Sequence, residues 1–390
     1  MLEYKPALPT VSRDTAMTRS IAAFWPAFPT SDALATRVTI VHSLSFSYHA
    51  GVTESYQNFV PPHPRFSLAT FPSPLERASR LEGALRAEGC GSVPRIYLKR
   101  DDLLSLGMGG NKIRNLEFSI GQALAEGATD VVTAGRPQSN HCRLTAAACA
   151  RAGLRAHIVL TGAPPPLMTG NLLLDEMLGA KIYWTGSEAR EFRDALVRML
   201  VDGMVSLGGK CFSIPVGGSD ARGALGHVLA ALELTRQCDA IGEAPAAVVL
   251  ATATGGTQAG MLTGFRKLGS PIAIHGFAVA KSAEELRETV SRIADEVARE
   301  IDAPSPRDGV DIDDAMLGAG YGIPSAAGDA AVLMLARTEG VFADPVYTGK
   351  AFAGLLARIR AERFAATASV VFLHTGGAPA LFAASHVIAP

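Results

Sequence analysis

Strands and helices alternate along most of the chain, and this alternation restricts the possible fold more than any other feature of the sequence. From Pro64 onward, short apolar runs recur, and each leads through a polar loop into a helical pattern. The runs predicted as strands are 96–100, 131–135, 156–160, 181–184, 211–216, 248–252, 272–279 and 369–374. Repeated βα units of this length predict an α/β protein with a mainly parallel, doubly wound sheet covered by helices on both faces.

The composition sets the class of protein and limits its partners. With 390 residues the chain can bury a large core and form two domains, and its 39 glycines suit the tight turns of an α/β enzyme. The 36 lysines and arginines nearly balance the 37 acidic residues, so nothing favours a nucleic-acid partner. No apolar run approaches the roughly 18 residues needed to span a bilayer, which predicts a soluble protein without a membrane partner.

The first 63 residues differ from the remainder. They contain scattered Pro, Ser and Thr and no sustained hydrophobic period. We predict a poorly ordered N-terminal extension over 1–63 that carries no chemistry.

The cysteines bear on the cellular compartment. There are five, an odd number without CxxC spacing, at positions 90, 142, 149, 211 and 238. This pattern favours neither a metal site nor a disulfide framework, and it predicts a cytoplasmic location.

The stretch from Gly109 to Glu117 is the strongest local signal for chemistry. Lys112 stands at the head of a helical pattern, after two glycines and after Asn111, which is a good N-cap residue. A cation is disfavoured at the positive end of a helix dipole, and the same field lowers the pKa of a lysine amine. An amine with a lowered pKa is suited to Schiff-base chemistry, although many lysines in such places are surface residues.

Three polar loops follow predicted strands, where the ligands of parallel sheets bind. Ala253–Thr257 joins a buried strand to a helix, and its small residues, hydroxyls and helix N-terminus suit a lone phosphate group. Gln138–His141 places four hydrogen-bonding side chains at a helix start, where His141 is either a proton shuttle near neutral pH or a capping residue. Thr375–Gly377 follows the last strand and offers a hydroxyl to a ring nitrogen or an anion.

Other catalytic arrangements lack their parts. The sequence has no G-x-S-x-G elbow and no H-E-x-x-H motif. Cys142 beside His141 could suggest a thiol nucleophile, but a buried cysteine in an alanine-rich helix fits the pattern better.

These motifs together match one family. Tyr97–Asp102, Met108–Lys112, Gln138–His141, Pro215–Ser219, Tyr321–Pro324, Asp344–Lys350 and His374–Phe382 occur in its order and with its spacing. The chain from Pro64 onward resembles the D-cysteine desulfhydrase and 1-aminocyclopropane-1-carboxylate deaminase family. The resemblance implies the tryptophan-synthase-β fold (fold-type II), with two doubly wound, mainly parallel sheets. It places a large domain at 64–104 and 209–390 and a small domain at 105–208.

The resemblance implies pyridoxal 5'-phosphate as the cofactor. Lys112 would bond its aldehyde, Asn140 its phenolic oxygen and Thr375 its pyridine nitrogen. The phosphate would be held by the loop of Ala253, Thr254, Gly255, Gly256 and Thr257. Asn115 departs from the pattern, because family members usually carry there a second lysine that helps to bind phosphate.

A small amino-acid substrate is implied as well, and a homodimer. The substrate-binding residues would be Ser139, Asn140, His141, Tyr321 and Tyr347. Of these, Ser139, Tyr321 and Tyr347 would be catalytic together with Lys112. Arg136-Pro137 and Leu144 replace the family's usual small, apolar and glutamine residues around this loop.

Within the family, two positions favour carbon–sulfur bond cleavage over deamination. His141 stands where the deaminases have glutamine, and Thr348 where they have a glutamate that pairs with the pyridine nitrogen. The predicted function is therefore the α,β-elimination of D-cysteine, or a close analogue, to pyruvate, ammonia and hydrogen sulfide. L-cysteate sulfo-lyase and 1-aminocyclopropane-1-carboxylate deaminase remain alternatives, as does a non-catalytic pyridoxal-phosphate binding protein.

Overall fold

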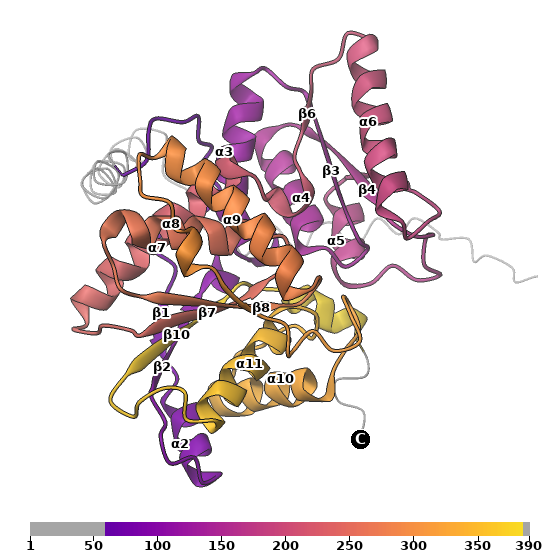
Figure 1. Cartoon of the computed structure of the whole chain (residues 1–390). Helices are drawn as coiled ribbons and strands as arrows, with labels where there is room; N and C mark the ends of the chain where they lie inside the picture. The colour runs from indigo at the N-terminus through magenta and orange to yellow at the C-terminus, as the bar shows by residue number, and fades with distance from the viewer. Residues whose placement is uncertain (1–58, 385–390) are drawn as a thin grey trace, which may run out of the picture. The chain divides into compact units, whose positions relative to one another are not determined.

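The computed structural model describes residues 59–384, all within one compact unit, Tyr56–Pro390 (Figure 1). The predicted poorly ordered extension falls, up to residue 58, outside the described residues. Val60 is buried against helices of the core, and His63 pairs with Glu300 at 3.0 Å. The packed part of the chain therefore begins by Phe59 rather than at Pro64.

The larger sheet has six strands. They are β1 (Leu75–Arg77), β2 (Arg95–Arg100), β7 (Ala247–Thr252), β8 (Ala273–Ala278), β9 (Asp311–Asp313) and β10 (Ser369–His374). Their order is β1-β2-β10-β7-β8-β9, and only the edge strand β1 is antiparallel to its neighbour. The central strands are buried on both faces, which is why they appear in the sequence as continuous apolar runs.

The smaller sheet has four parallel strands in the order β5-β4-β3-β6. They are β3 (Asp130–Gly135), β4 (Arg155–Leu160), β5 (Lys181–Trp184) and β6 (Cys211–Ser213). The assignment of the two sheets to a large and a small domain stays a prediction. Its boundary at 209 needs one correction, because β6 pairs with β3 and so belongs to the smaller sheet.

Ten α-helices connect the strands in the described part of the chain. They are α2 (Ser79–Ala87), α3 (Lys112–Ala125), α4 (Asn140–Ala152), α5 (Gly170–Met177), α6 (Arg190–Ser206), α7 (Ala221–Ala240), α8 (Gly256–Leu268), α9 (Ala283–Glu300), α10 (Ala326–Glu339) and α11 (Thr348–Arg360).

Helices pack on both faces of the larger sheet, as the doubly wound pattern predicts. Figure 1 shows α7, α8 and α9 above this sheet and α10 and α11 below it. Phe352 of α11 meets Phe372 of β10 edge-on, with ring centroids 5.0 Å apart, and both side chains are fully buried. On the other face, Phe265 of α8 packs in a cluster with Val371. This packing fixes the ends of the central strands, from which the polar loops emerge.

All eight predicted strands are present, but shorter elements were missed. The predicted strand 211–216 ends at Ser213, and a 3₁₀ turn, η4 (Val216–Gly218), follows it. Gly217 has φ +74°, which interrupts the extended backbone. The three-residue strands β1 and β9 are too short to show a period in the sequence.

A buried ion-pair network holds the start of α3 against the larger sheet. Arg114 bonds the Asp101 carboxylate through Nε and Nη2, both at 2.8 Å, and the Glu233 carboxylate of α7 through Nη1 and Nη2, both at 2.9 Å. Lys99 of β2 also bonds Glu233. The network lies two residues from Lys112 and ties three elements together at that point.

Candidate active site

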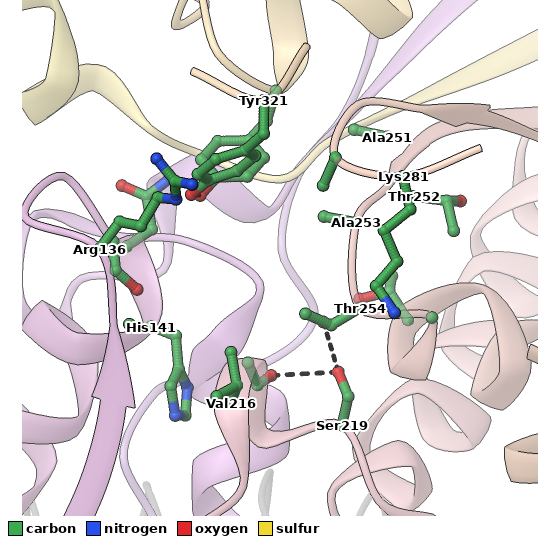
Figure 2. Close-up of a pocket in the computed structure, with 18 of the residues that line it drawn as sticks. Arg136, His141, Val216, Ser219, Ala251, Thr252, Ala253, Thr254, Lys281 and Tyr321 are labelled. Atoms are coloured by element: carbon green, nitrogen blue, oxygen red, sulfur yellow. Dashed lines mark hydrogen bonds between the residues drawn. The ribbon is translucent and has the colours of Figure 1, made fainter. Parts of the chain in front are cut away.

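A cavity of about 370 Å³ lies where the loops after the strands of both sheets meet. Residues that follow β3, β4, β5, β6, β7, β8 and β10 line it, together with the first residues of α3. The structure thus brings all three loops singled out in the sequence to one cavity. Figure 2 shows side chains from both sheets pointing into this space.

Lys112 enters the cavity from the first turn of α3. Its amine has no hydrogen-bond or ion-pair partner among the described residues, and burial lowers its pKa to about 8. The sequence assigned the shift to the helix dipole, whereas the cause in the structure is loss of hydration. An amine of this pKa is largely available as a nucleophile just above neutral pH.

Asn111 is the N-cap residue of α3, as predicted, but its backbone is already helical and its side chain makes no capping hydrogen bond. The side-chain amide instead donates to Thr257 Oγ1 at 2.9 Å. Asn111 therefore links the Lys112 turn to the predicted phosphate loop.

The start of α4 presents Ser139 and Asn140 to the cavity. Ser139 is the N-cap, and its hydroxyl accepts from the Cys142 amide at 3.2 Å. Asn140 Oδ1 accepts from Asn171 Nδ2 at 2.9 Å, and this hydrogen bond orients the Asn140 amide. The Nδ2 group of Asn140 has no acceptor among the described residues. A free amide donor of this kind suits a phenolic oxygen.

The burial of His141 disfavours the role of a proton shuttle near neutral pH, which the sequence left open. Burial, helped by the charge of Lys112, lowers its pKa to about 3. Thr133 Oγ1 donates to the Ile214 carbonyl at 2.9 Å, and it therefore accepts from His141 Nε2–H at 2.9 Å. The other nitrogen, Nδ1, is a buried acceptor without a partner in the described part of the chain.

The loop after β7 has the shape of an anion cradle. Ala253, Thr254, Gly255 and Thr257 line the cavity, and α8 begins at Gly256, so its free N–H groups face the same space. The chain segments around this loop approach one another closely because two of the residues at the contacts are glycines. A Cβ on Gly217 would lie 2.4 Å from Thr254 Oγ1, and one on Gly256 would lie 2.9 Å from Ser219 Oγ. Gly256 itself lies behind the lining residues.

Tyr321 and Tyr347 both line the cavity and contact each other there. Their hydroxyls are hydrogen-bonded, and their ring centroids are 5.8 Å apart in an edge-on arrangement. Burial is the largest cause of the raised pKa of each phenol. For Tyr347, the neighbouring Tyr321 phenol raises the pKa further. Both phenols are therefore protonated, and able to donate, near neutral pH.

The Arg136 guanidinium stacks on the Tyr321 ring, 5.1 Å from its centroid, and also pairs with Glu188 at 3.2 Å (Figure 2). This arginine is one of the departures noted in the sequence. It lines the cavity beside Tyr321.

Thr375 lines the cavity, and its backbone carbonyl accepts from the Asn111 amide at 3.0 Å. Thr348 does not line it: its side chain is fully buried and donates to Asp344 Oδ2 at 2.6 Å. No hydrogen bond joins the Thr375 hydroxyl to another of the described residues, so it is available to a ligand in the cavity.

Sequence reasoning missed several lining residues. Ser219 had a visible signal, because it ends the quoted Pro215–Ser219 motif, and its hydroxyl bonds Thr254 Oγ1 at 2.5 Å. Others come from loops and helices that carry no motif, among them Thr161, Arg190, Arg193, Lys281 and Thr289.

Within residues 59–384, no group of His, Cys, Asp and Glu side chains is arranged to hold a metal ion. In the same residues, no helix has the length and apolarity to cross a membrane.

Comparisons with known proteins agree with this geometry. The family model described as pyridoxal-phosphate dependent enzyme matches residues 66–376. A D-cysteine desulfhydrase of Salmonella typhi is 40% identical over 325 residues, which are 82% of this chain and 96% of the relative. A solved homologue of ACC deaminase is 30% identical with a TM-score of 0.76, covering 84% of this chain and 96% of its own. The processed form of threonine deaminase isoform 2 from Solanum lycopersicum shares the fold. It is 20% identical with a TM-score of 0.57, covering 79% of this chain and 80% of its own.

Proposed function

The chain belongs to the pyridoxal-phosphate dependent enzyme family, and from this premise we propose that it catalyses the α,β-elimination of D-cysteine or a close analogue. One molecule of D-cysteine and one of water would give pyruvate, ammonia and hydrogen sulfide. The observation that carries the proposal is Lys112, an unpaired amine with a pKa of about 8 that lines the same cavity as two protonated tyrosines.

The residues of the cavity fit the cofactor. Lys112 is free to bond an aldehyde, and Asn140 Nδ2 and the Thr375 hydroxyl are free to bond the ring. The cradle of Thr254, Gly255 and the N-terminus of α8 would hold the phosphate. When bound, pyridoxal phosphate supplies an electron sink for the bond that is broken at the α-carbon.

Proton movement falls to Lys112 and the tyrosines. The Lys112 amine can take the α-proton of the substrate, because its lowered pKa leaves it partly unprotonated near neutral pH. The raised pKa values of Tyr321 and Tyr347 make these phenols donors rather than bases. They can protonate the departing sulfur atom. These pKa shifts favour Lys112 over a tyrosine as the base that removes the α-proton.

The N-terminus of α4 provides the site for the substrate carboxylate. Ser139 already caps this helix, and the helix end favours an anion. His141, neutral and fixed by Thr133, would orient the substrate without exchanging protons.

Two other substrates of the same family remain candidates. Three arginines line the cavity, Arg136, Arg190 and Arg193, which would favour the sulfonate of L-cysteate. For 1-aminocyclopropane-1-carboxylate, the neutral Thr375 hydroxyl offers a weaker partner for the pyridine nitrogen than a carboxylate would. Of these two substrates, 1-aminocyclopropane-1-carboxylate is therefore less favoured than L-cysteate.

Turnover assays on the full chain with its cofactor test the proposal. We expect pyruvate and sulfide in equal amounts from D-cysteine, and much less of both from L-cysteine. Sulfite from L-cysteate, or 2-oxobutyrate from 1-aminocyclopropane-1-carboxylate, at a higher kcat/KM would transfer the assignment to that substrate. A loaded protein that is inert toward all four compounds would support the non-catalytic alternative.

Replacing Tyr347 by phenylalanine tests the proton donor. Tyr347→Phe should lower kcat for D-cysteine by about 10²-fold to 10⁴-fold, because the departing sulfur loses its donor. KM should change less, since the ring remains. The matched control is Tyr183→Phe in β5, whose hydroxyl bonds His157 at 3.0 Å and does not line the cavity. An unchanged kcat in Tyr347→Phe would remove this residue from the mechanism.

We also propose that the protein is a cytoplasmic homodimer. All five cysteines are free thiols, which is compatible with a reducing compartment. Large apolar side chains are exposed on α5 and α6, among them Met177, Phe192 and Met199. A second copy of the chain could cover them.

A further inference from the structure

The phosphate end of the cavity needs more positive charge than the cradle supplies. A phosphate monoester carries a charge between about −1.5 and −2 near pH 7. A helix N-terminus contributes the equivalent of only about half a positive charge. The side chains around it, Thr254, Thr257 and Ser219, are neutral. Asn115 beneath the loop is neutral as well, and it is fully engaged with the Gly218 carbonyl at 3.0 Å and His227 at 2.9 Å.

The cations that line the cavity are mostly committed elsewhere. Arg136 pairs with Glu188 at 3.2 Å, and Arg193 with Asp194 at 2.7 Å. Arg190 is exposed and begins α6, the helix that follows β5 of the smaller sheet. The Lys112 nitrogen is used by the cofactor's aldehyde. Lys281, half-buried in the cavity lining, has no ion-pair or hydrogen-bond partner among residues 59–384.

Sheet register places Lys281 beside the phosphate loop. Thr252 at the end of β7 is paired with Ala278 at the end of β8, and the Val279 amide bonds the Thr252 carbonyl at 3.1 Å. Thr254 lies two residues beyond β7, and Lys281 lies three residues beyond β8. The two loops thus leave adjacent parallel strands at the same level. Figure 2 shows the Lys281 side chain extending toward Thr254.

The helix that follows Lys281 is packed against the same loop. A Cβ added to Gly255 would lie 3.1 Å from Val290 Cγ2 and 3.4 Å from Thr289 Cγ2, both on α9. The segment that carries Lys281 therefore lies between β8, which pairs with β7, and α9, which packs against Gly255 of the cradle.

We propose that Lys281 is the counter-ion of the cofactor's phosphate group and sets the affinity of the protein for pyridoxal phosphate. The inference rests on the proposed use of this cavity for pyridoxal phosphate, but not on which amino acid is the substrate. The ligand chemistry is a phosphate monoester at the N-terminus of α8.

Cofactor affinity, measured with and without the phosphate, tests the inference. The full chain is freed of cofactor, and pyridoxal phosphate or pyridoxal is titrated back while the absorbance change is followed. Lys281→Met should weaken pyridoxal phosphate about tenfold, the loss expected when a charged hydrogen bond is removed. The affinity for pyridoxal should stay unchanged. Lys281→Arg should retain most of the affinity, and added salt should weaken the wild type more than Lys281→Met.

Arg190→Met is the matched control, because it removes a cation of the same cavity that belongs to α6 and not to the loops that form the cradle. It should leave the affinity for pyridoxal phosphate unchanged. An equal loss for both ligands in Lys281→Met, or no loss for either, would overturn the proposal. Since no turnover is measured, a phosphate-specific loss would stand even if D-cysteine proved not to be the substrate. Conversely, if the protein turns over D-cysteine and Lys281→Met binds pyridoxal phosphate as tightly as the wild type, only the counter-ion role of Lys281 is refuted.

Discussion

Lys112→Ala is expected to lower D-cysteine turnover by at least about 10⁴-fold, since both the covalent attachment of the cofactor and the base for the α-proton are lost. The visible absorbance of the covalently attached cofactor should disappear at the same time. Steady-state kinetics and a spectrum of the purified variant measure the two effects. Lys210→Ala, at an exposed lysine outside the cavity lining, is the control and should change neither.

The fold should survive this substitution. Lys112 bonds no other described side chain, its charged form is disfavoured by burial, and alanine is the better helix former. The free energy of unfolding should therefore stay within about 0.5 kcal/mol of the wild type without cofactor. A variant that retains turnover would remove Lys112 from the chemistry, and one that unfolds would indicate a structural role instead.

Arg114→Met is expected to cause the largest loss of stability, about 3–5 kcal/mol in the free energy of unfolding. Arg114 is 3% exposed and pairs with two carboxylates, Asp101 and Glu233, which are 0% and 2% exposed. The variant would leave these carboxylates without their guanidinium partner, with only Lys99 as a compensating cation. Urea unfolding without cofactor measures the difference. Arg292→Met, at an exposed pair with Glu296, should cost no more than about 1 kcal/mol.

The pH dependence of this loss has a definite sign. Burial raises the pKa values of Asp101 and Glu233, but the Arg114 guanidinium outweighs burial and holds both pKa values below their ordinary range in the folded protein. A carboxyl group with a depressed folded pKa stabilises the fold above its unfolded pKa, and this contribution is lost as the pH falls through the folded value. The difference between wild type and Arg114→Met should therefore be greatest near neutral pH and shrink in acid. A difference that grows in acid would contradict the assigned charges.

The fold was predictable from the sequence where burial leaves a long pattern. The central strands β2, β7 and β10 are buried on both faces, so they appear as continuous apolar runs. The edge strands β1 and β9 have three residues each, and local pattern says nothing at that length. The position of β6 in the smaller sheet depends on pairing with a strand about 80 residues earlier, which no local signal encodes.

The cavity was predictable at the level of loops and less so for single side chains. Parallel strands end at one edge of their sheet, so the loops at 138–141, 253–257 and 375–377 could be expected to converge. The roles of Asn111 and His141 could not be obtained in this way, because each depends on burial and on a distant partner. Lys281 gave no signal in the sequence. Its place follows from the register of β7 and β8, which only the structure shows.

Reduction of the loaded protein with borohydride, followed by peptide mass spectrometry, identifies the lysine that carries the cofactor. The reduction converts the imine formed with a lysine amine into a stable secondary amine. We expect one modified peptide, with the pyridoxyl phosphate group on Lys112, and an unmodified peptide containing Lys281. Modification of another lysine with Lys112 left intact would contradict the proposed site, and with it the roles given to the residues around Lys112.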